Sequence, residues 1–522
     1  MHITTRKLLL SILSLNLSLL ASGHGDDSHR DSHEVKPPES QNTPHTLQVY
    51  QTSRQGDRLK KLDINNLSID EPSRKLVLDP STSFQTLIGI GGSFTESSAY
   101  VLSELSDKVR KQVMSAYFSP SGAHISLTRT HIASCDFSLR NYTFAPVPND
   151  VGLEHFSIEP DRTYLLPMIK EAQSMPGADF KILASPWTAP PWMKTNGTWN
   201  GGELKPEFYD AFARYIVKYI EAYAGEGVPI WALTPINEPL GNDANWESTH
   251  FNPEQMRTFI ADHLGPALHK SGLNTPVWIY DQNREDIMLD WADAILGDEK
   301  AATFVAGMAV HWYQSTVDVG GDMLDAVLAK YPDTRILHSE GCIDSIGNDE
   351  PIGAWLEDDW YWRPEATDWG MFWAKEENKP HHPPYRAFYR YTRDLIGGLN
   401  HNLVGWIDWN MILNTRGGPN HANNFCLAPV LVDSGRDHAY FTPLFYSIAH
   451  FSKFIRPGAV RIGLSGHDDA FMATAFCNPD GSIAIAVFNL TEERITYSLD
   501  TPDDSFSLEI PGQALQTLVL PR

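Results

Sequence analysis

Eight short apolar runs alternate with amphipathic helical segments through the middle of the chain. Two of the helical segments, Ser103–Tyr117 and Pro206–Ala224, carry apolar residues three and four positions apart, the spacing that buries one face of a helix. Near-continuous apolar strands alternating with helices predict a parallel sheet with helical crossovers. Eight such units predict an α/β fold, a (β/α)8 TIM barrel. The predicted barrel strands are Phe84–Phe94, Ile125–Ile132, Phe180–Trp187, Ile230–Glu238, Val277–Gln282, Val305–Tyr313, Arg335–Glu340 and Leu403–Trp409.

The two ends of the chain have a different pattern, with short strands and turns in place of strand–helix pairs. Residues 46–83 and 457–522 contain short apolar or alternating runs, among them Phe471–Phe476 and Ile483–Phe488. The Asn-Pro-Asp-Gly sequence between these two runs predicts a hairpin turn. We therefore expect a smaller all-β sandwich side domain built from both termini, with the barrel of residues 84–456 inserted into it.

Residues 1–23 have the organisation of a secretory signal peptide. Arg6 and Lys7 form its basic region, Leu8–Leu20 its apolar region, and the Ala-Ser-Gly sequence at 21–23 its cleavage site. The apolar region is shorter than a membrane span needs, and an uncleaved signal anchor is the alternative. The polar residues 24–45 predict a disordered linker, with metal binding by its histidines as a second interpretation. We expect a secreted or periplasmic protein without a transmembrane segment.

The charge and the cysteines argue against several classes of protein. The chain has 65 acidic and 41 basic residues, a net charge of −24. Nucleic acids and anionic membranes attract basic patches, so neither is an expected partner. The four cysteines are scattered and indicate neither a disulfide framework nor a zinc knuckle: Cys135, Cys342, Cys426 and Cys477. We expect four mostly buried thiols, with one disulfide as the alternative. The oligomeric state stays open.

Two predicted strands end in a glutamate that follows a polar residue. The fourth strand ends in Asn237 and Glu238, and the seventh ends in Ser339 and Glu340. The carboxyl ends of barrel strands meet at one rim, where TIM-barrel active sites lie. Glu238 and Glu340 are therefore expected to face one another across the barrel mouth. Two opposed carboxylates are the apparatus of glycoside hydrolysis.

Glycoside hydrolysis needs one protonated carboxyl group and one ionised carboxylate. The amide of Asn237 can hold the sugar 2-hydroxyl group, which favours the neighbouring Glu238 as the acid/base. Glu340 is then the nucleophile that attacks the anomeric carbon. Tyr313, at the end of the sixth strand, is expected to donate a hydrogen bond that keeps Glu340 ionised.

Other residues at the strand ends are candidates for binding substrate. Trp187 and Trp409 offer ring faces to sugar C–H groups, or else pack the barrel mouth. Asp136 can accept hydrogen bonds from sugar hydroxyls, with a loop cap as the alternative. Arg129 either takes part in the site or pairs structurally with a rim carboxylate, and His311 is interpreted as a supporting donor rather than a base. We find no HExxH motif, phosphate loop, Ser-His-Asp order or dinucleotide fingerprint.

The chain resembles glycoside hydrolase family 30 and, within that family, its glucosylceramidase (acid β-glucosidase) group. The resemblance runs from about residue 84 to 456, and the C-terminal strands are similar to the family's side domain. The motifs that carry it are Gly89-Ile-Gly-Gly92, Arg129, Ala133-Ser-Cys-Asp-Phe-Ser138, Ala184-Ser-Pro-Trp-Thr188, Lys194-Thr-Asn-Gly197, Asn237-Glu-Pro239, His311-Trp-Tyr313, Ser339-Glu340, Gly405-Trp406, Asp408-Trp-Asn410, Gly417-Gly-Pro-Asn420 and His450-Phe-Ser-Lys-Phe-Ile455.

This resemblance implies a retaining β-glycosidase that forms a covalent glycosyl-enzyme intermediate and needs no metal or organic cofactor. It assigns the acid/base to Glu238 and the nucleophile to Glu340, in agreement with the interpretation of the strand ends. The resemblance places the sugar-binding residues at Asp136, Trp187, Asn237 and Trp409, and a further active-site asparagine at Asn424.

The sequence departs from the glucosylceramidase pattern in ways that bear on the substrate. His421 stands where members of that group commonly have tryptophan, and a Trp-rich stretch, residues 355–373, follows Glu340. Loop aromatics at a barrel mouth can stack further sugar units, or can pack the loop against the barrel. A sphingolipid glucoside is the first hypothesis for the substrate, and a β-1,6-glucan or another extracellular β-glycan is the second. A non-catalytic carbohydrate-binding protein is the remote third.

Overall fold

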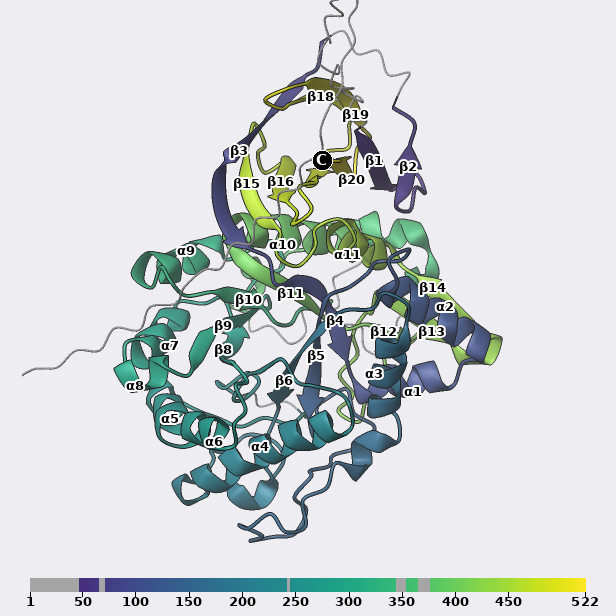
Figure 1. The fold of residues 1–522 in the computed structure, drawn as a ribbon. Coiled ribbons are helices and arrows are strands. Elements are labelled where there is room, and N and C mark those ends of the chain that lie inside the picture. The colour runs from purple at the N-terminus through teal and green to yellow at the C-terminus, as the bar shows by residue number, and fades with distance from the viewer. Residues whose placement is uncertain (1–46, 65–70, 242–244, 344–353, 365–375) are drawn as a thin grey trace, which may run out of the picture. The chain divides into compact units, whose positions relative to one another are not determined.

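The computed structural model describes residues 47–64, 71–241, 245–343, 354–364 and 376–522 (Figure 1). The predicted signal peptide and linker lie outside these ranges, as do Trp369, Phe372 and Trp373 of the Trp-rich stretch. None of the described helices is both long and apolar enough to cross a bilayer.

Eight parallel strands close into a barrel in the order β10–β11–β4–β5–β6–β7–β8–β9, which confirms the predicted fold class. Each strand corresponds to one of the eight predicted runs. The boundaries differ most at Phe84, which belongs to a longer strand outside the barrel, and at the fourth strand, which shortens to two residues. The barrel strands are β4 (Gly89–Phe94), β5 (Leu127–Ile132), β6 (Lys181–Pro186), β7 (Ala232–Leu233), β8 (Val277–Asn283), β9 (Val305–His311), β10 (Ile336–His338) and β11 (Leu403–Asn410).

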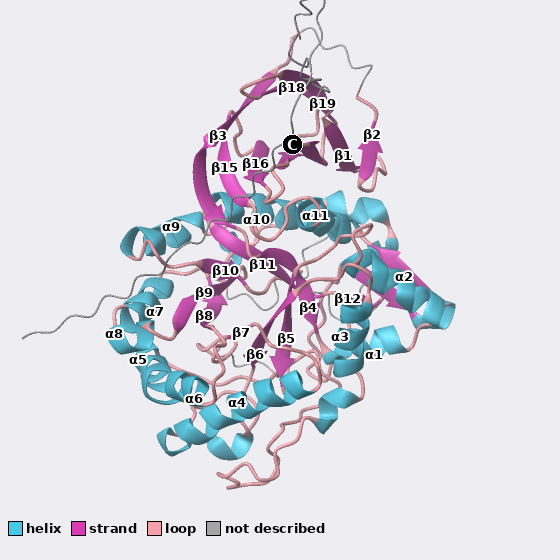
Figure 2. Ribbon diagram, in the orientation of Figure 1, coloured by secondary structure: helices cyan, strands magenta, loops and turns pink. Residues whose placement is uncertain are grey.

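Helices surround the barrel strands (Figure 2). The predicted helix Pro206–Ala224 is a short 3₁₀ turn followed by α4, whereas the predicted helix Ser103–Tyr117 starts too early. A separate helix ends at Ser103, and Ser106 caps the next one by accepting a hydrogen bond from the Val109 amide. The helices are α1 (Glu96–Ser103), α2 (Asp107–Phe118), α3 (Leu165–Ser174), α4 (Tyr209–Gly225), α5 (Pro253–Thr258), the π-helical η4 (Phe259–Leu264), α6 (Gly265–Lys270), α7 (Ile287–Leu296), α8 (Glu299–Ala302), α9 (Gly321–Lys330), α10 (Ala387–Asn400) and α11 (Pro443–Ser452). Short 3₁₀ turns are η1 (Glu159–Arg162), η2 (Pro191–Met193), η3 (Pro206–Phe208), η5 (Ala354–Leu356), η6 (Asp358–Trp362), η8 (Lys379–His381) and η9 (Ser434–Arg436).

The inside of the barrel is filled by two layers of opposite character. The lower layer, which we call the apolar plug, consists of Leu127, Leu183, Ala232, Trp278, Ala309, Leu337, Val404 and Ile407. Two residues further along three of these strands, the buried side chains are polar: Arg129, Ser185 and His311. Because alternate residues of a strand share one face, the same strands supply both the apolar plug and the polar floor above it.

Strands from both chain ends form one nine-stranded sheet in the order β19–β18–β3–β15–β16–β17–β20–β1–β2, as predicted for a side domain built from both termini. The long β3 pairs with β18 near its start and with β15 further along, so the sheet curls around its own apolar core. Its strands are β1 (Gln48–Ser53), β2 (Lys60–Leu62), β3 (Arg74–Thr86), β15 (Val460–Ser465), β16 (Phe471–Cys477), β17 (Ile483–Asn489), β18 (Ile495–Asp500), β19 (Ser505–Ile510) and β20 (Ala514–Leu520). A small third sheet contains β12 (Ile412–Asn414), β13 (Val430–Asp433) and β14 (His438–Phe441).

Helices α10 and α11 join the barrel to this sheet (Figure 1). Both faces of β17 are buried there. Ala484, Ala486 and Phe488 pack in the cluster that contains the two helices, whereas Ile485 and Val487 pack inside the sheet's own core. The period-two alternation of a strand thus connects two hydrophobic cores directly.

Part of the Trp-rich stretch belongs to this junction. Trp355, Trp360, Tyr361 and Trp362 are at most 6% exposed and join the same apolar cluster. The Trp362 indole donates a hydrogen bond of 3.1 Å to the backbone oxygen of Gln513, and its ring stacks on a phenylalanine of α10. These four aromatic residues therefore pack in the apolar cluster of α10 and α11, in keeping with the packing role considered for them, and Trp362 also contacts the side domain.

Candidate active site

A cavity of about 1160 Å³ opens at the carboxyl ends of the barrel strands. Eight of the ten predicted site residues line it: Asp136, Trp187, Asn237, Glu238, Tyr313, Glu340, Trp409 and Asn424. The other two, Arg129 and His311, are fully buried beneath it and contact the carboxylates. The structure thus brings all ten predicted residues together.

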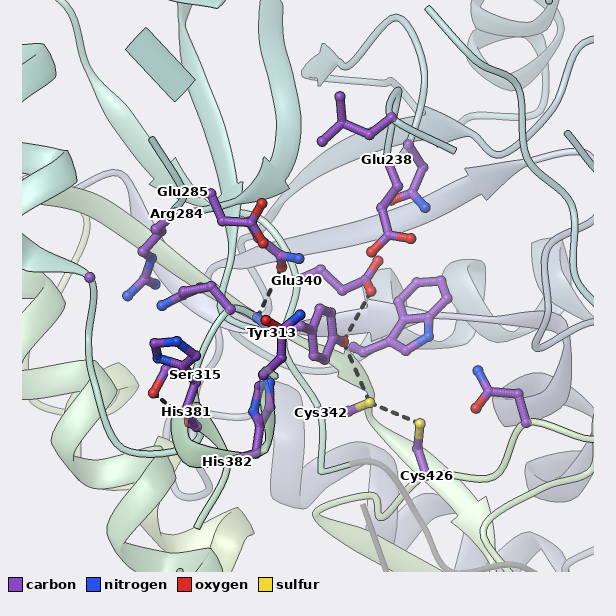
Figure 3. A pocket seen from close by; sticks show the side chains of 18 of the residues that line it. Glu238, Arg284, Glu285, Tyr313, Ser315, Glu340, Cys342, His381, His382 and Cys426 are labelled. Carbon is purple, nitrogen blue, oxygen red and sulfur yellow. Dashed lines mark hydrogen bonds between the residues drawn. The ribbon is translucent and has the colours of Figure 1, made fainter. Parts of the chain in front are cut away.

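Glu238 and Glu340 point toward one another from the ends of the fourth and seventh barrel strands (Figure 3). One oxygen of each carboxylate and one ring nitrogen of His311 lie within 4.8 Å of one another. Retaining glycosidases hold their carboxyl groups about 5–5.5 Å apart, whereas inverting enzymes leave room for a water molecule at about 6.5–9.5 Å. The close approach therefore matches direct attack by one carboxylate on the sugar.

Glu340 is held by two donors. Arg129 Nη1 donates to Oε2, and the Tyr313 hydroxyl donates to Oε1 over 3.1 Å. Burial raises the pKa of Glu340, and the cations of His311 and Arg129 oppose that rise. The predicted hydrogen bond from Tyr313 is present, and Arg129 adds a charge that favours the ionised form a nucleophile needs.

Glu238 sits on a sharp turn of the backbone. Its φ of 46° lies in the left-handed region, and its amide donates 3.0 Å to the backbone oxygen of Asp281. This turn ends the fourth strand early and directs the carboxylate into the cavity. The side chain of Glu238 is 17% exposed against 7% for Glu340, so the predicted acid/base is the more open of the pair.

Asn237 is oriented by the same arginine that holds Glu340. Arg129 Nη2 donates to Asn237 Oδ1 over 2.8 Å, which leaves the amide nitrogen of this cavity-lining residue to donate toward a bound sugar. One guanidinium group therefore sets the positions of two residues that were assigned separate roles from the sequence.

Asp281 is a central residue that the sequence analysis missed. Its carboxylate accepts hydrogen bonds from Arg129 (2.7 Å), Thr234 (2.6 Å) and Ser339 (2.6 Å), and His311 Nε2 lies 3.0 Å away. Burial alone would raise the pKa of Asp281, but Arg129 and His311 outweigh it and hold the pKa far below its usual range. Asp281 is thus an ionised anchor beneath both glutamates.

A β-bulge explains why Asp281 escaped prediction. The register between β8 and β9 shifts between Tyr280 and Gln282, and both Tyr280 and Asp281 have positive φ. Regular alternation from Trp278, which belongs to the apolar plug, would place Tyr280 inside and Asp281 outside. The only sequence signal was an aspartate that directly follows an apolar run.

His311 bridges the anchor and the catalytic pair. Its Nδ1 lies 3.3 Å from Glu238 and 3.9 Å from Glu340. Burial lowers its pKa, but the carboxylates of Glu340, Asp281 and Glu238 outweigh this and raise the pKa to about 9. Although Glu238, His311 and Glu340 are spaced like metal ligands, a cationic His311 and the adjacent Arg129 would repel a metal ion.

The sugar-binding candidates form one wall of the cavity. Trp187 and Trp409 stack on each other with ring centroids 4.8 Å apart, and Arg129 lies over both rings. Asp136 Oδ2 accepts a hydrogen bond of 2.9 Å from Asn424, while Asp136 Oδ1 is buried without a partner. A buried acceptor without a donor costs free energy that a sugar hydroxyl would recover.

His421, which stands where glucosylceramidases commonly have tryptophan, lies behind this wall and not in it. Its ring contacts the backbone oxygen of Ser138 at 3.0 Å and the buried carboxylate of Glu247 at 3.3 Å. Burial lowers the pKa of His421, and its contact with Glu247 outweighs this to give a raised pKa. The replacement of tryptophan by His421 therefore alters the residues behind the sugar-binding wall and not the surface of the cavity.

Family models match most of the chain. The glycosyl hydrolase family 30 TIM-barrel domain matches residues 87–359 and 374–455, and the family 30 beta sandwich domain matches residues 458–518.

Relatives of two kinds match this chain over most of its length. The lysosomal acid glucosylceramidase of Mus musculus is 34% identical over 90% of this chain and 88% of its own length. The endo-1,6-beta-D-glucanase neg1 of Aspergillus fumigatus is 25% identical over 86% of this chain and 88% of its own length. Among solved structures, SrfJ from Salmonella typhimurium superposes with a TM-score of 0.79 at 28% identity, covering 91% of this chain and 100% of SrfJ.

Proposed function

The chain belongs to glycosyl hydrolase family 30 and is a glycoside hydrolase, and we propose that it cleaves β-glucosidic bonds with retention, acting on glucosylceramide-like substrates. The observation that carries the proposal is the pair Glu238 and Glu340, which have one oxygen of each carboxylate within 4.8 Å of the other above a buried Arg129. We assign the nucleophile to Glu340 and the acid/base to Glu238.

In the first step Glu340 attacks the anomeric carbon while Glu238 gives its proton to the leaving oxygen. Arg129 and Tyr313 hold Glu340 ionised and fix the direction of its free lone pairs. The leaving aglycone departs past Glu238, which is the more exposed of the two carboxyl groups. The product is a glycosyl ester on Glu340.

In the second step Glu238, now ionised, takes a proton from a water molecule that attacks the same carbon. The second inversion restores the original β configuration, and Glu340 leaves as a carboxylate. Asn237, whose amide nitrogen is directed by Arg129, donates to the sugar 2-hydroxyl group during both displacements.

The cavity contains features that suit two substrates. Apolar side chains suited to a lipid line it: Leu240, Trp246, Ile287 and Met323. Four carboxylates also line it: Glu285, Asp286, Asp318 and Asp322. The arginine among the described lining residues, Arg284, is bound to Asp394 at 2.8 Å and does not neutralise them.

The four lining carboxylates support a second candidate substrate, a β-1,6-linked gluco-oligosaccharide, because carboxylates accept hydrogen bonds from sugar hydroxyls. The family relatives named as β-1,6-glucanases are in keeping with this candidate. We further propose, from the Leu8–Leu20 region and its flanks, that the protein is secreted or periplasmic, with sphingolipid metabolism as its setting under the first candidate.

Two measurements test the mechanism. A 2-fluoro-glucoside, which slows the second step, is expected to label the protein with one fluoroglucosyl group on the peptide that contains Glu340. Proton NMR of the first product is expected to show the β-anomer. Label on another carboxylate would reject the assignment of Glu340, and an α-anomeric first product would reject retention.

A comparison of substrates tests the aglycone. The ratio of kcat/KM on glucosylceramide micelles to kcat/KM on β-1,6-gluco-oligosaccharides is measured for the wild type and for Glu285→Gln. For a lipid substrate we expect the micelles to be strongly preferred and the variant to change little. A preference for oligosaccharides that grows with chain length, and that Glu285→Gln reduces several-fold, would favour the glucan instead.

A further inference from the structure

Two cysteines that are far apart in sequence meet in the wall of the catalytic cavity. Cys342 lies two residues after the nucleophile Glu340, and Cys426 lies in the segment between β12 and β13. Their Sγ atoms are 2.8 Å apart, and each side chain is 1% exposed (Figure 3). Cys135 and Cys477, by contrast, make their hydrogen-bonding contacts with Ser138 and with the backbone oxygen of Asn478.

The backbone holds the two cysteines in register. The amide of Leu427 donates 3.0 Å to the backbone oxygen of Ile343, so the residues that follow each cysteine are joined by a hydrogen bond. The amide of Cys426 donates 3.0 Å to the backbone oxygen of Gly417, which fixes the other side of its segment. The two sulfur atoms therefore face one another because of main-chain pairing and not through a chance rotamer.

The separation of the sulfur atoms favours a covalent link over two thiols. Unbonded carbon atoms already touch at about 3.5–4.0 Å, and sulfur is larger. Two sulfurs at 2.8 Å are closer than an unbonded contact, while a disulfide places them at about 2.05 Å with little movement of the chain.

We propose that Cys342 and Cys426 form a disulfide that ties the segment carrying the nucleophile to the loop carrying Asn424. With a small-molecule disulfide such as oxidised glutathione as oxidant, one thiolate attacks it and releases one glutathione thiolate. The second cysteine thiolate then attacks the mixed disulfide and releases the other. Two cysteine thiols are oxidised and one small-molecule disulfide is reduced to two thiols, which take up the two protons that the cysteines lose.

The cross-link joins the segment of the nucleophile to the sugar-binding wall. On one side Cys342 lies 3.5 Å from the Tyr313 hydroxyl that donates to Glu340. On the other side Asn424, two residues before Cys426, donates to Asp136. Because the two cysteines are 84 positions apart, the link also removes much conformational freedom from the unfolded chain. The disulfide therefore both stabilises the fold and fixes Asn424 relative to the nucleophile.

Peptide mapping tests the covalent link and does not depend on the proposed activity. The full chain is equilibrated with oxidised glutathione, denatured without reductant, alkylated, digested and analysed by mass spectrometry. We expect the peptides with Cys342 and Cys426 to be joined and two hydrogens lighter than their sum, and Cys135 and Cys477 to be alkylated. Full alkylation of all four cysteines would overturn the proposal.

Thermal denaturation gives the second test. A reducing agent is expected to lower the Tm of the wild type by several degrees and to leave the Tm of Cys426→Ala unchanged. Cys477→Ala serves as the matched control and should respond to the reductant as the wild type does. An equal response of Cys426→Ala and the wild type would overturn the proposal.

The catalytic constants test the consequence for the sugar wall. Reduction of the wild type is expected to raise KM several-fold and to change kcat less, because Asn424 positions the sugar-binding Asp136 through its Oδ2 and does not act on the reacting carbon. The Cys477→Ala control should show the same split. A protein with the disulfide present and with KM unchanged on reduction would limit the link to stability and overturn its role in fixing Asn424.

Discussion

The apolar plug and the polar floor above it belong to the same strands, two residues apart, but the plug stabilises the barrel and the floor holds the catalytic residues. Leu127, Leu183 and Leu337 are fully buried among apolar neighbours and stabilise the barrel. One step higher, Arg129, Ser185 and Ser339 are equally buried, but Arg129 donates to Ser185, and both Arg129 and Ser339 donate to the carboxylate of Asp281. Burial is therefore the same in the packing layer and in the functional layer. The hydrogen-bond partners of the buried groups distinguish the two.

Replacing the nucleophile should cause the largest loss of catalytic activity. Glu340→Gln keeps the shape of the side chain but removes the attacking charge, so kcat/KM is expected to fall by about 10⁴-fold or more. Ligand binding should persist. Kinetics on an aryl β-glucoside and calorimetric binding of a glucosidase inhibitor measure the two effects. Turnover close to that of the wild type would remove Glu340 as nucleophile.

Glu238→Gln should have the next largest effect, a loss of about 10²–10⁴-fold in kcat for poor leaving groups. The loss should shrink for an aryl glycoside, whose leaving group needs little proton assistance. Azide can replace the water of the second step without a base, so it should restore activity and give a β-glucosyl azide. An α-azide product, or equal losses for all leaving groups, would contradict the role of acid/base.

The anchor Asp281 acts through its neighbours, and Asp281→Asn should lower kcat by about 10- to 100-fold because it frees Arg129 and His311 to move. Loss of the Asp281 charge should also lower the pKa of His311 from its value of about 9. The pH profile of kcat/KM detects this change. Thr234→Val, which removes one 2.6 Å donor to the same carboxylate, is the milder control. An unchanged profile would leave Asp281 with a structural role only.

The pH dependence of the wild type should follow from the charges in the floor. Glu340 must be ionised, and burial raises its pKa, so the acid limb of kcat/KM moves upward. The first step needs the proton that Glu238 donates, and above about 9 His311 loses the charge that faces Glu340. We expect a bell-shaped profile with its maximum below neutrality. A kcat/KM that rises toward pH 9 would be incompatible with this assignment.

A change in the apolar plug should have the smallest effect on catalysis. Leu183→Ala removes a fully buried side chain from the plug and is expected to lower the free energy of unfolding by about 2–5 kcal/mol. At temperatures where the variant stays folded, kcat/KM should remain within a few-fold of the wild type. Urea denaturation and kinetics on the same preparation measure both quantities. A large loss of kcat without loss of stability would contradict the assignment of the plug to stability and of the floor to catalysis.

Local sequence patterns predict most of the architecture because they are properties of neighbouring residues. Near-continuous apolar runs such as Val305–Tyr313 predict buried parallel strands, and strand order then places Glu238 and Glu340 at one rim. The same reasoning gathers Asp136 and Trp187 around them, the family resemblance adds Asn424, and the structure places these residues in one cavity.

Strand periodicity and strand order predict the barrel, a β side domain built from both chain ends and the pair of opposed carboxylates, because these patterns need no knowledge of distant contacts. The remaining features depend on the tertiary structure, including the curling of the side domain into one nine-stranded sheet. The bulge at Tyr280 turned Asp281 inward, and the junction buried Trp355 and Trp362 rather than exposing them to sugar. Closure of the barrel brought Cys342 to Cys426, a contact between two of the four mostly buried thiols that their scattered positions in the sequence did not indicate. Each of these outcomes depends on side chains from distant segments competing for the same buried space, a competition that local patterns do not record.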